Sequence, residues 1–302
     1  MRFKSRTAVI IGLIFLATVL VPLFLTIYGD IYTEWLWFDS LSYLSVYRTR
    51  LFASWGMFLA GGLVTLAFLI LNLVVVPPRM VERSERVIRI QQNRFRLNIR
   101  SPIVVLAAAS LLLAFFLGLR AAGESMDFLR FQNAASFGLE DPIFGLDAGF
   151  YVFRLPFYRS LVGWVTSLLV FSLIGLGIFY MLTDTIRERG PAAHLSILGA
   201  LLLLTILARY QLDRLSLLDS ARGVVFGAGY TDVHARLPLL QIQSVIVVIG
   251  ALALLVNVFI RRWRLFLLVG GAWLLVAVLG PIYPGLVQRF RVDPNELATE
   301  RP

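Results

Sequence analysis

Seven long apolar runs constrain this chain more than any other feature of its sequence. They cover residues 7–28, 51–76, 103–119, 157–183, 192–210, 237–260 and 265–287. Allowing for ragged ends, each run approaches the roughly 17 to 25 apolar residues that a helix needs to cross the hydrocarbon core of a bilayer. We therefore predict an all-α, polytopic membrane bundle of seven transmembrane helices over residues 1–288. Residues 289–302 are expected to begin an extracytoplasmic segment.

The composition agrees with a membrane protein and excludes several kinds of site. Hydrophobic residues make up 59% of the chain and charged residues 15%, against just under half and about a quarter in soluble domains. The absence of cysteine excludes disulfides, iron–sulfur clusters, thiolate zinc sites and cysteine nucleophiles. The chain has two histidines, His194 and His234, and both lie near the ends of apolar runs. They therefore cannot form a pair of axial haem ligands inside a bundle. No cofactor is predicted.

The basic residues predict the orientation of the chain. The net charge of +10 arises from bases in the short segments between apolar runs, which is typical of membrane topology rather than of nucleic-acid binding. The N-terminus and the segments after the second, fourth and sixth runs hold 15 of the 28 Lys and Arg residues in less than a third of the length outside the runs. This density predicts a cytoplasmic N-terminus and an extracytoplasmic C-terminus in the plasma membrane. A cleavable signal peptide is the alternative for the first run, but that run is longer than a signal core.

The central parts of the seven runs contain no ionisable residue. Proton pumps and voltage sensors place such residues in the membrane, so this absence argues against those classes. The milder polar residues, such as Asn72 and Asn257, indicate contacts between helices, with a polar substrate path as the alternative. Between the fourth and fifth runs, Gly190 and Pro191 are expected to break the helix.

The segment 79–100 combines seven arginines with regularly interleaved apolar residues. This pattern predicts a basic amphipathic segment that binds anionic lipid at the inner face of the membrane, with RNA binding as the weaker alternative. The candidate headgroup ligands are Arg79, Arg83, Arg86, Arg89, Arg94, Arg96 and Arg100.

The loops expected on the outer side are rich in aromatic residues. Residues 34–52 are expected to form an interfacial aromatic helix that leads into the second run. Two later loops, FGLDAGFYVFRLP (144–156) and FGAGYTDVHARLP (226–238), share Phe-Gly and, ten residues on, Arg-Leu-Pro directly before an apolar run. This repeat predicts a shared loop plan, arising by duplication or by convergence.

The two repeated loops are predicted to pack together as a platform for a protein partner or outer domain. Aromatic residues and arginine are enriched at protein interfaces. Alternatively, the rings only anchor in lipid headgroups. The candidate platform residues are Phe144, Gly145, Arg154, Pro156, Phe226, Gly227, Arg236 and Pro238.

Acidic residues in the same loops are weak candidates for a metal site. Asp141, Asp147 and Asp232 carry oxygen ligands, but the regular ligand spacing of a calcium loop is missing. We therefore predict no metal site and expect these carboxylates to stabilise turns or to pair with arginine.

Four stretches resemble the uncharacterised bacterial protein family 0182. They are residues 34–52, 141–158, 212–238 and 288–302, which fall in order across nearly the whole chain. The resemblance implies a seven-span membrane domain in the plasma membrane, followed in typical members by a large extracytoplasmic domain. It implies no activity. Since the chain ends where members of the family continue, we expect a fragment, a split gene product or a shortened member.

Two functions remain open from the sequence. The first is a non-enzymatic membrane module that anchors or docks an extracytoplasmic domain or partner chain. The second is a transporter or channel for a lipid-like or weakly polar solute, since the uncharged runs disfavour charged substrates. An intramembrane enzyme is not expected, because no catalytic residue set is recognisable in the sequence.

Overall fold

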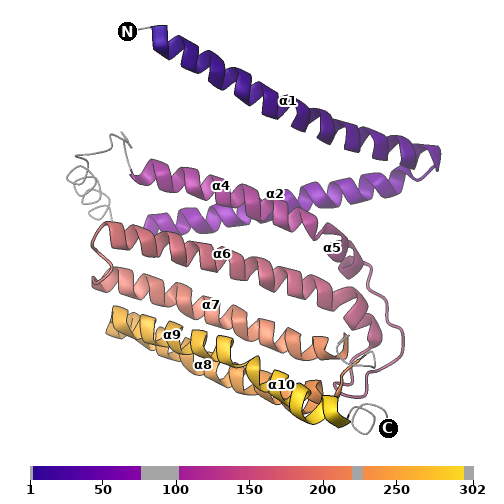
Figure 1. Ribbon diagram of the computed structural model, residues 1–302, viewed down its shortest axis with the longest axis vertical. Helices are drawn as coiled ribbons and strands as arrows, with labels where there is room; N and C mark the ends of the chain where they lie inside the picture. The colour runs from indigo at the N-terminus through magenta and orange to yellow at the C-terminus, as the bar shows by residue number, and fades with distance from the viewer. Residues whose placement is uncertain (1–2, 76–101, 220–226, 296–302) are drawn as a thin grey trace. The chain divides into compact units, whose positions relative to one another are not determined.

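The computed structural model describes residues 3–75, 102–219 and 227–295, without the side chains of residues 3–17, 19, 23, 27 and 102–104. The described chain is all-α, as predicted, and has two compact units, Met1–Trp55 and Gly56–Pro302. Its α-helices are α1 (Phe3–Ser40), α2 (Leu44–Val75), α4 (Pro102–Gly123), α5 (Ser125–Gln132), α6 (Leu155–Leu182), α7 (Arg189–Leu215), α8 (Leu237–Ile260), α9 (Trp263–Leu279) and α10 (Ile282–Val287) (Figure 1). Short π-helical turns are η1 (Phe150–Arg154), η3 (Asp232–Arg236) and η4 (Gln288–Val292), and short 3₁₀ turns are η2 (Ser216–Asp219) and η5 (Asp293–Asn295).

The first unit is a helical hairpin formed by α1 and the start of α2. The aromatic segment 34–52, expected to form an interfacial helix leading into the second run, is divided between the end of α1, which continues through Ser40, and the start of α2, which begins at Leu44. The turn is closed by Tyr47, whose hydroxyl donates to the carbonyl of Ile31 and whose ring contacts Phe38. With 38 residues, α1 is about 57 Å long, nearly twice the thickness of the hydrocarbon core.

The second unit is a bundle in which α7 is the most buried helix. One apolar cluster joins α6 to α7 through Leu176, Tyr180 and Leu198, and another joins α7 to α8 through Leu203 and Val247. Helices α6, α7 and α8 follow one another side by side in Figure 1. In contrast, α9 has no fully buried residue, although Phe266, Val269 and Trp273 pack against the cluster between α7 and α8.

Helices α2 and α4 approach closely at glycine. A Cβ added at Gly118 would lie 2.9 Å from the carbonyl oxygen of Phe58, and one at Gly61 would lie 2.6 Å from the Cβ of Ala121. These distances are shorter than van der Waals contact, so only glycine permits this backbone separation. Small residues commonly serve this purpose between membrane helices, where packing rather than the hydrophobic effect drives association.

Among the described residues, six stretches are long and apolar enough to cross a membrane. They are Leu44–Val75, Val105–Gly123, Phe150–Leu182, Arg189–Asp219, Asp232–Ile260 and Trp263–Asn295, and each covers all but one or two residues, or all, of one predicted run. The remaining run, residues 7–28, falls on α1, where most side chains lie outside the described residues. The count of seven spans and the orientation of the chain therefore stay predictions.

The helix break between α6 and α7 lies earlier than predicted. Gly190 and Pro191 belong to the first turn of α7, while the chain turns at Asp184, which has a positive φ of 53°. Proline is tolerated in a first helical turn because the N–H groups there have no intrahelical acceptor. The prediction therefore located the connection but assigned it to the wrong residues.

A buried histidine links three helices of the bundle. The Nδ1 atom of His194 in α7 lies 2.8 Å from the hydroxyl of Tyr180 in α6, and its Nε2 lies 2.9 Å from Oδ1 of Asn72 in α2. The amide nitrogen of Asn72 donates to the carbonyl of Phe68, which leaves Oδ1 as the acceptor towards the ring. His194 therefore carries its proton on Nε2 and accepts from the tyrosine on Nδ1. The prediction that Asn72 mediates a contact between helices is confirmed.

Candidate functional site

Three π-helical turns gather at one end of the bundle, which we name the pocket end. Here α4 and α7 end and α6 and α8 begin. Turn η1 leads directly into α6, η3 directly into α8, and η4 directly follows α10. Because π-turns are rare and occur frequently at functional sites, this end is where a site is best sought.

The two repeated loops have the same local structure where both are described. Gly145 and Gly227 both have positive φ, at 65° and 122°. In each loop a five-residue π-turn then ends at arginine, Arg154 or Arg236, and a proline follows in the first turn of the helix. The shared loop plan is thus confirmed for these residues, while Phe226 lies outside them.

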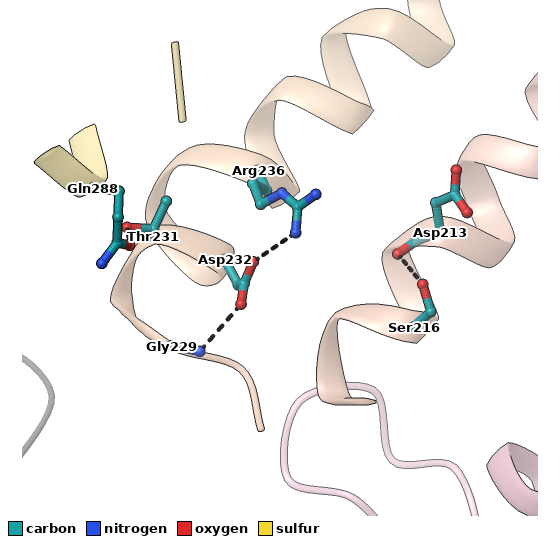
Figure 2. A network of polar contacts seen from close by, with 7 residues as sticks. All are labelled: Asp213, Ser216, Gly229, Thr231, Asp232, Arg236 and Gln288. Carbon is teal, nitrogen blue, oxygen red and sulfur yellow. Dashed lines mark hydrogen bonds and ion pairs between the residues drawn. The ribbon is translucent and has the colours of Figure 1, made fainter. Parts of the chain in front are cut away.

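A large hollow opens at the pocket end, with a volume of about 910 Å³. Its walls come from the start of α6, the end of α7 with η2, the region of η3 and the start of α8, and α10 with η4. The polar lining residues are Arg159, Asp213, Ser216, Asp219, Thr231, Asp232, Arg236, Gln243 and Gln288. Figure 2 shows Asp232 and Arg236 on one wall, and Asp213 with Ser216 on a facing element.

Charges within this hollow are largely balanced by one another. Arg236 donates to Asp232 at 3.1 Å, and this aspartate also accepts from the backbone N–H of Gly229. Arg159 of α6 lies 3.8 Å from Asp213 of α7. Since Asp232 is only 3% exposed, its arginine partner is needed to offset the cost of burying a carboxylate. The hollow therefore presents paired charges of both signs.

Residues from the last described turns complete the hollow. The hydroxyl of Thr231 donates to the side-chain oxygen of Gln288, which lies 57 residues further along the chain. Arg291 stacks over the ring of Tyr230, and Val292 is completely buried. The chain from η4 to η5 thus packs against η3 beside the hollow.

Asp147 organises the loop before η1. Its carboxylate accepts from the hydroxyl of Ser136 at 2.7 Å and from the backbone N–H groups of Phe137, Gly138 and Gly149 at 3.1, 2.8 and 2.7 Å. These bonds, led by the one from Ser136, lower the pKa of Asp147 to about 2, because each favours the charged form. The carboxylate therefore acts as a fixed acceptor for the loop.

Asp141 organises the preceding turn of the same loop in a similar way. It accepts from the N–H groups of Ile143, Phe144 and Leu146 and from the hydroxyl of Tyr151. Desolvation raises its pKa, but these four bonds outweigh that effect and leave the pKa lowered. The expectation that these carboxylates stabilise turns is met in the geometry of both residues.

We expect the loop to lose this order in acid. A carboxylate whose pKa is depressed in the folded chain stabilises it fully above the unfolded value of about 3.9, and this contribution is lost as the pH falls towards the folded value. For Asp147 the window runs from about pH 4 to about pH 2. Amide NMR signals of Gly138 and Gly149 should titrate with a midpoint near 2, and Asp147→Asn should abolish that titration. A midpoint near the unfolded value would contradict the bonding described.

The predicted site residues are only partly brought together. Asp232 and Arg236 line the hollow, whereas Arg154 is exposed at the end of η1. The seven arginines of the 79–100 segment lie outside the described residues. The sequence reasoning missed Asp213 and Gln288 as lining residues, and the repeated Arg-Leu-Pro entry was the one signal pointing to this end. Within the described ranges, no group of three His, Asp or Glu side chains is placed to hold a metal ion.

The fold and surface define a class of protein. Six apolar stretches of spanning length, together with exposed side chains such as Phe52, Leu71 and Phe259 along their flanks, indicate a multi-pass helical membrane protein. A family model described as "Uncharacterised protein family (UPF0182)" matches residues 9–302. The chain therefore belongs to this family, and the resemblance seen in the sequence is confirmed.

Bacterial relatives support this assignment. A UPF0182 protein of Pelotomaculum thermopropionicum is 38% identical over 321 residues, covering 100% of this chain and 34% of the relative. Those of Desulforamulus reducens and Kocuria rhizophila are 33% and 35% identical, with 100% and 99% of this chain covered and 35% and 31% of the relatives. The chain thus spans about a third of the length of these curated relatives. No solved structure matches it.

Proposed function

We propose that this chain is a bacterial plasma-membrane module whose pocket end faces the outside of the cell and docks an extracytoplasmic protein domain or partner chain. The observation that carries this proposal is the 910 Å³ hollow and its paired charges of both signs. A protein segment offers matching donors and acceptors of both kinds, and such mixed polar contacts are typical of protein interfaces.

The position of the hollow favours docking over the passage of a solute. Its lining on α8 reaches from Leu239 to Gln243, within the first two turns of a 24-residue helix. Below that level, α7 and α8 are joined by the apolar cluster around Val247 and Leu254. A transport pathway would have to continue through this apolar region. A docking site for a protein requires only the residues at one end of the bundle.

The length of the relatives supports the same proposal. The chain matches about a third of each relative, so the relatives carry further sequence that a membrane module can hold at the surface. In this chain the last described turn, η5, ends close to the hollow through its connection to η4. An outer domain, whether it continues the same chain or belongs to another chain, would therefore start beside the proposed docking site.

Site-specific photo-crosslinking in cells of the native bacterium tests the proposal. A photoreactive phenylalanine analogue replaces Leu239, which lines the hollow, or Ile242, which is on α8 at a similar depth but 58% exposed. We expect protein adducts from position 239 and lipid adducts alone from position 242. Docking is rejected if the inserted, folded chain gives only lipid adducts at both positions, or equal protein adducts at both.

A further inference from the structure

A second polar hollow lies between α4, α6 and α7 at the pocket end and contains three guanidinium groups. Arg120 comes from the last turn of α4, Arg159 from the second turn of α6, and Arg209 from α7. Its volume is about 280 Å³. Three arginines from three helices converge here although they are far apart in the sequence, so their proximity is a property of the fold.

The carboxylates in this hollow do not saturate the three arginines. Asp213 is 3.8 Å from Arg159 and 3.7 Å from Arg209, longer than a strong charge-assisted hydrogen bond. Glu124 is the other acidic lining residue. Three positive charges against two negative ones leave one net positive charge. Each guanidinium carries five N–H donors, so donors remain available for an anion.

Arg120 is held in position by its contacts with α6. Its Nη1 atom donates to the hydroxyl oxygen of Ser167. Its Nη2 atom lies over Gly163, where an added Cβ would come within 3.0 Å. Gly163 and Ser167 lie four residues apart on one face of α6. These small residues therefore leave room for the guanidinium group of Arg120 and not for the backbone of another helix.

An apolar hollow directly adjoins the arginine hollow. It has a volume of about 270 Å³ and is lined by Met57, Ala60, Gly61, Val64, Ala121, Phe157, Leu161 and Trp164. Both hollows share Arg120, Glu124 and Ser160 as lining residues. An arginine cluster therefore meets an apolar recess along a common rim, which is the arrangement that a molecule with an anionic head and an apolar chain requires.

We propose that these two hollows form a binding site for an anionic phospholipid. The phosphodiester, with its single negative charge, matches the net positive charge among Arg120, Arg159 and Arg209, and its oxygens accept their N–H groups. One acyl chain occupies the apolar recess between α2, α4 and α6. This site shares Arg159 and Asp213 with the larger hollow, but its ligand, a phospholipid, is different from the protein partner proposed for that hollow.

Native mass spectrometry of the purified full chain tests the site with defined lipids. The probes are dioleoyl phosphatidylglycerol, the zwitterionic dioleoyl phosphatidylcholine and chain-free glycerol 3-phosphate. The variant Arg120→Gln/Arg209→Gln removes two of the three guanidinium groups. Its matched control, Arg154→Gln/Arg289→Gln, removes the same charge from two exposed arginines at the pocket end. A third variant, Ala60→Leu, fills the apolar recess without changing any charge.

We expect phosphatidylglycerol to bind the wild type and the matched control about tenfold more tightly than phosphatidylcholine. Arg120→Gln/Arg209→Gln should lose this preference, and Ala60→Leu should weaken binding of both lipids. Equal affinity of the wild type for both lipids would overturn the proposal, as would equal loss in the matched control. Tight binding of glycerol 3-phosphate that Ala60→Leu leaves unchanged would identify a free phosphate site instead. If the glutamine variant does not fold, the wild-type lipid preference and Ala60→Leu still decide.

Discussion

Replacing Asn257 with Leu is expected to lower the free energy of unfolding of the bundle by about 3 kcal/mol. Asn257 is completely buried in α8. Its amide donates to the hydroxyl of Ser196 in α7 at 2.8 Å and to the carbonyl of Arg262 at 3.0 Å, while its Oδ1 accepts from the N–H of Arg262 at 3.0 Å. One side chain thus ties two helices to the tight turn before α9.

The size of this loss in unfolding free energy follows from the hydrogen bonds that a leucine side chain cannot make. Three hydrogen bonds disappear, each worth about 0.5 to 1.5 kcal/mol, and the end of α8 loses the acceptor that fixes its turn. That turn also places Arg261 at a positive φ of 59°, a conformation that a non-glycine residue adopts at some cost and only when its surroundings hold it. Removal of Asn257 therefore weakens both a helix contact and a strained turn.

Unfolding in mixed detergent with increasing dodecyl sulfate measures this change. Val256→Leu is the matched control, since Val256 is adjacent to Asn257 and 54% exposed. We expect the control to remain within about 0.5 kcal/mol of the wild type. A similarly small effect of Asn257→Leu would show that the network contributes little to stability.

Replacing Gly149 with Ala is expected to cost about 2 to 3 kcal/mol, although only one methyl group is added. Gly149 is buried at the start of η1 and has an ordinary φ of −62°. The added Cβ would overlap the carbonyl oxygen of Ala135 and lie 2.8 Å from Oδ1 of Asp147. Glycine is therefore required here by the close approach of two backbone segments.

The same substitution should also disturb the Asp147 titration, because the methyl group displaces the carboxylate acceptor. The control is Gly123→Ala at the end of α4, where an added Cβ meets no other atom within 4 Å. Alanine is the better helix former, so this control should be neutral or stabilise the chain by up to about 1 kcal/mol. If both variants had equal stability, the described approach of Ala135 to Gly149 would be wrong.

Much of the fold could be predicted because the spanning helices depend on local composition. Six apolar runs overlap described stretches that are long and apolar enough to span a membrane, and the repeated Arg-Leu-Pro sequence correctly predicted the starts of α6 and α8. The connections between helices could not be predicted in the same way. Pro191 was expected to break a helix that it instead begins, since proline permits either outcome and the preceding turn at Asp184 carries no proline or glycine.

The candidate site was less predictable because it depends on long-range contacts. Asp232 and Arg236 form a pair within one turn and were recognisable as charged loop residues. The facing wall, with Asp213 from α7 and Gln288 from η4, required knowledge of which helix ends meet. The link between His194 and Asn72 likewise joins residues 122 positions apart. No local pattern specifies such pairs.

The three π-turns at the pocket end have a consequence for how this family can change its length. A π-turn closes its hydrogen bonds one residue later than an α-helix, so it accommodates one extra residue without interrupting the helical chain. Deleting that residue from η1 would leave a regular helix and rotate everything before it by about 100° around the axis of α6. Single-residue insertions and deletions at these turns can therefore change the direction of the loops, while the residues of α6 and α8 that face the neighbouring helices stay the same. A change of length at the pocket end therefore need not alter the packing inside the bundle.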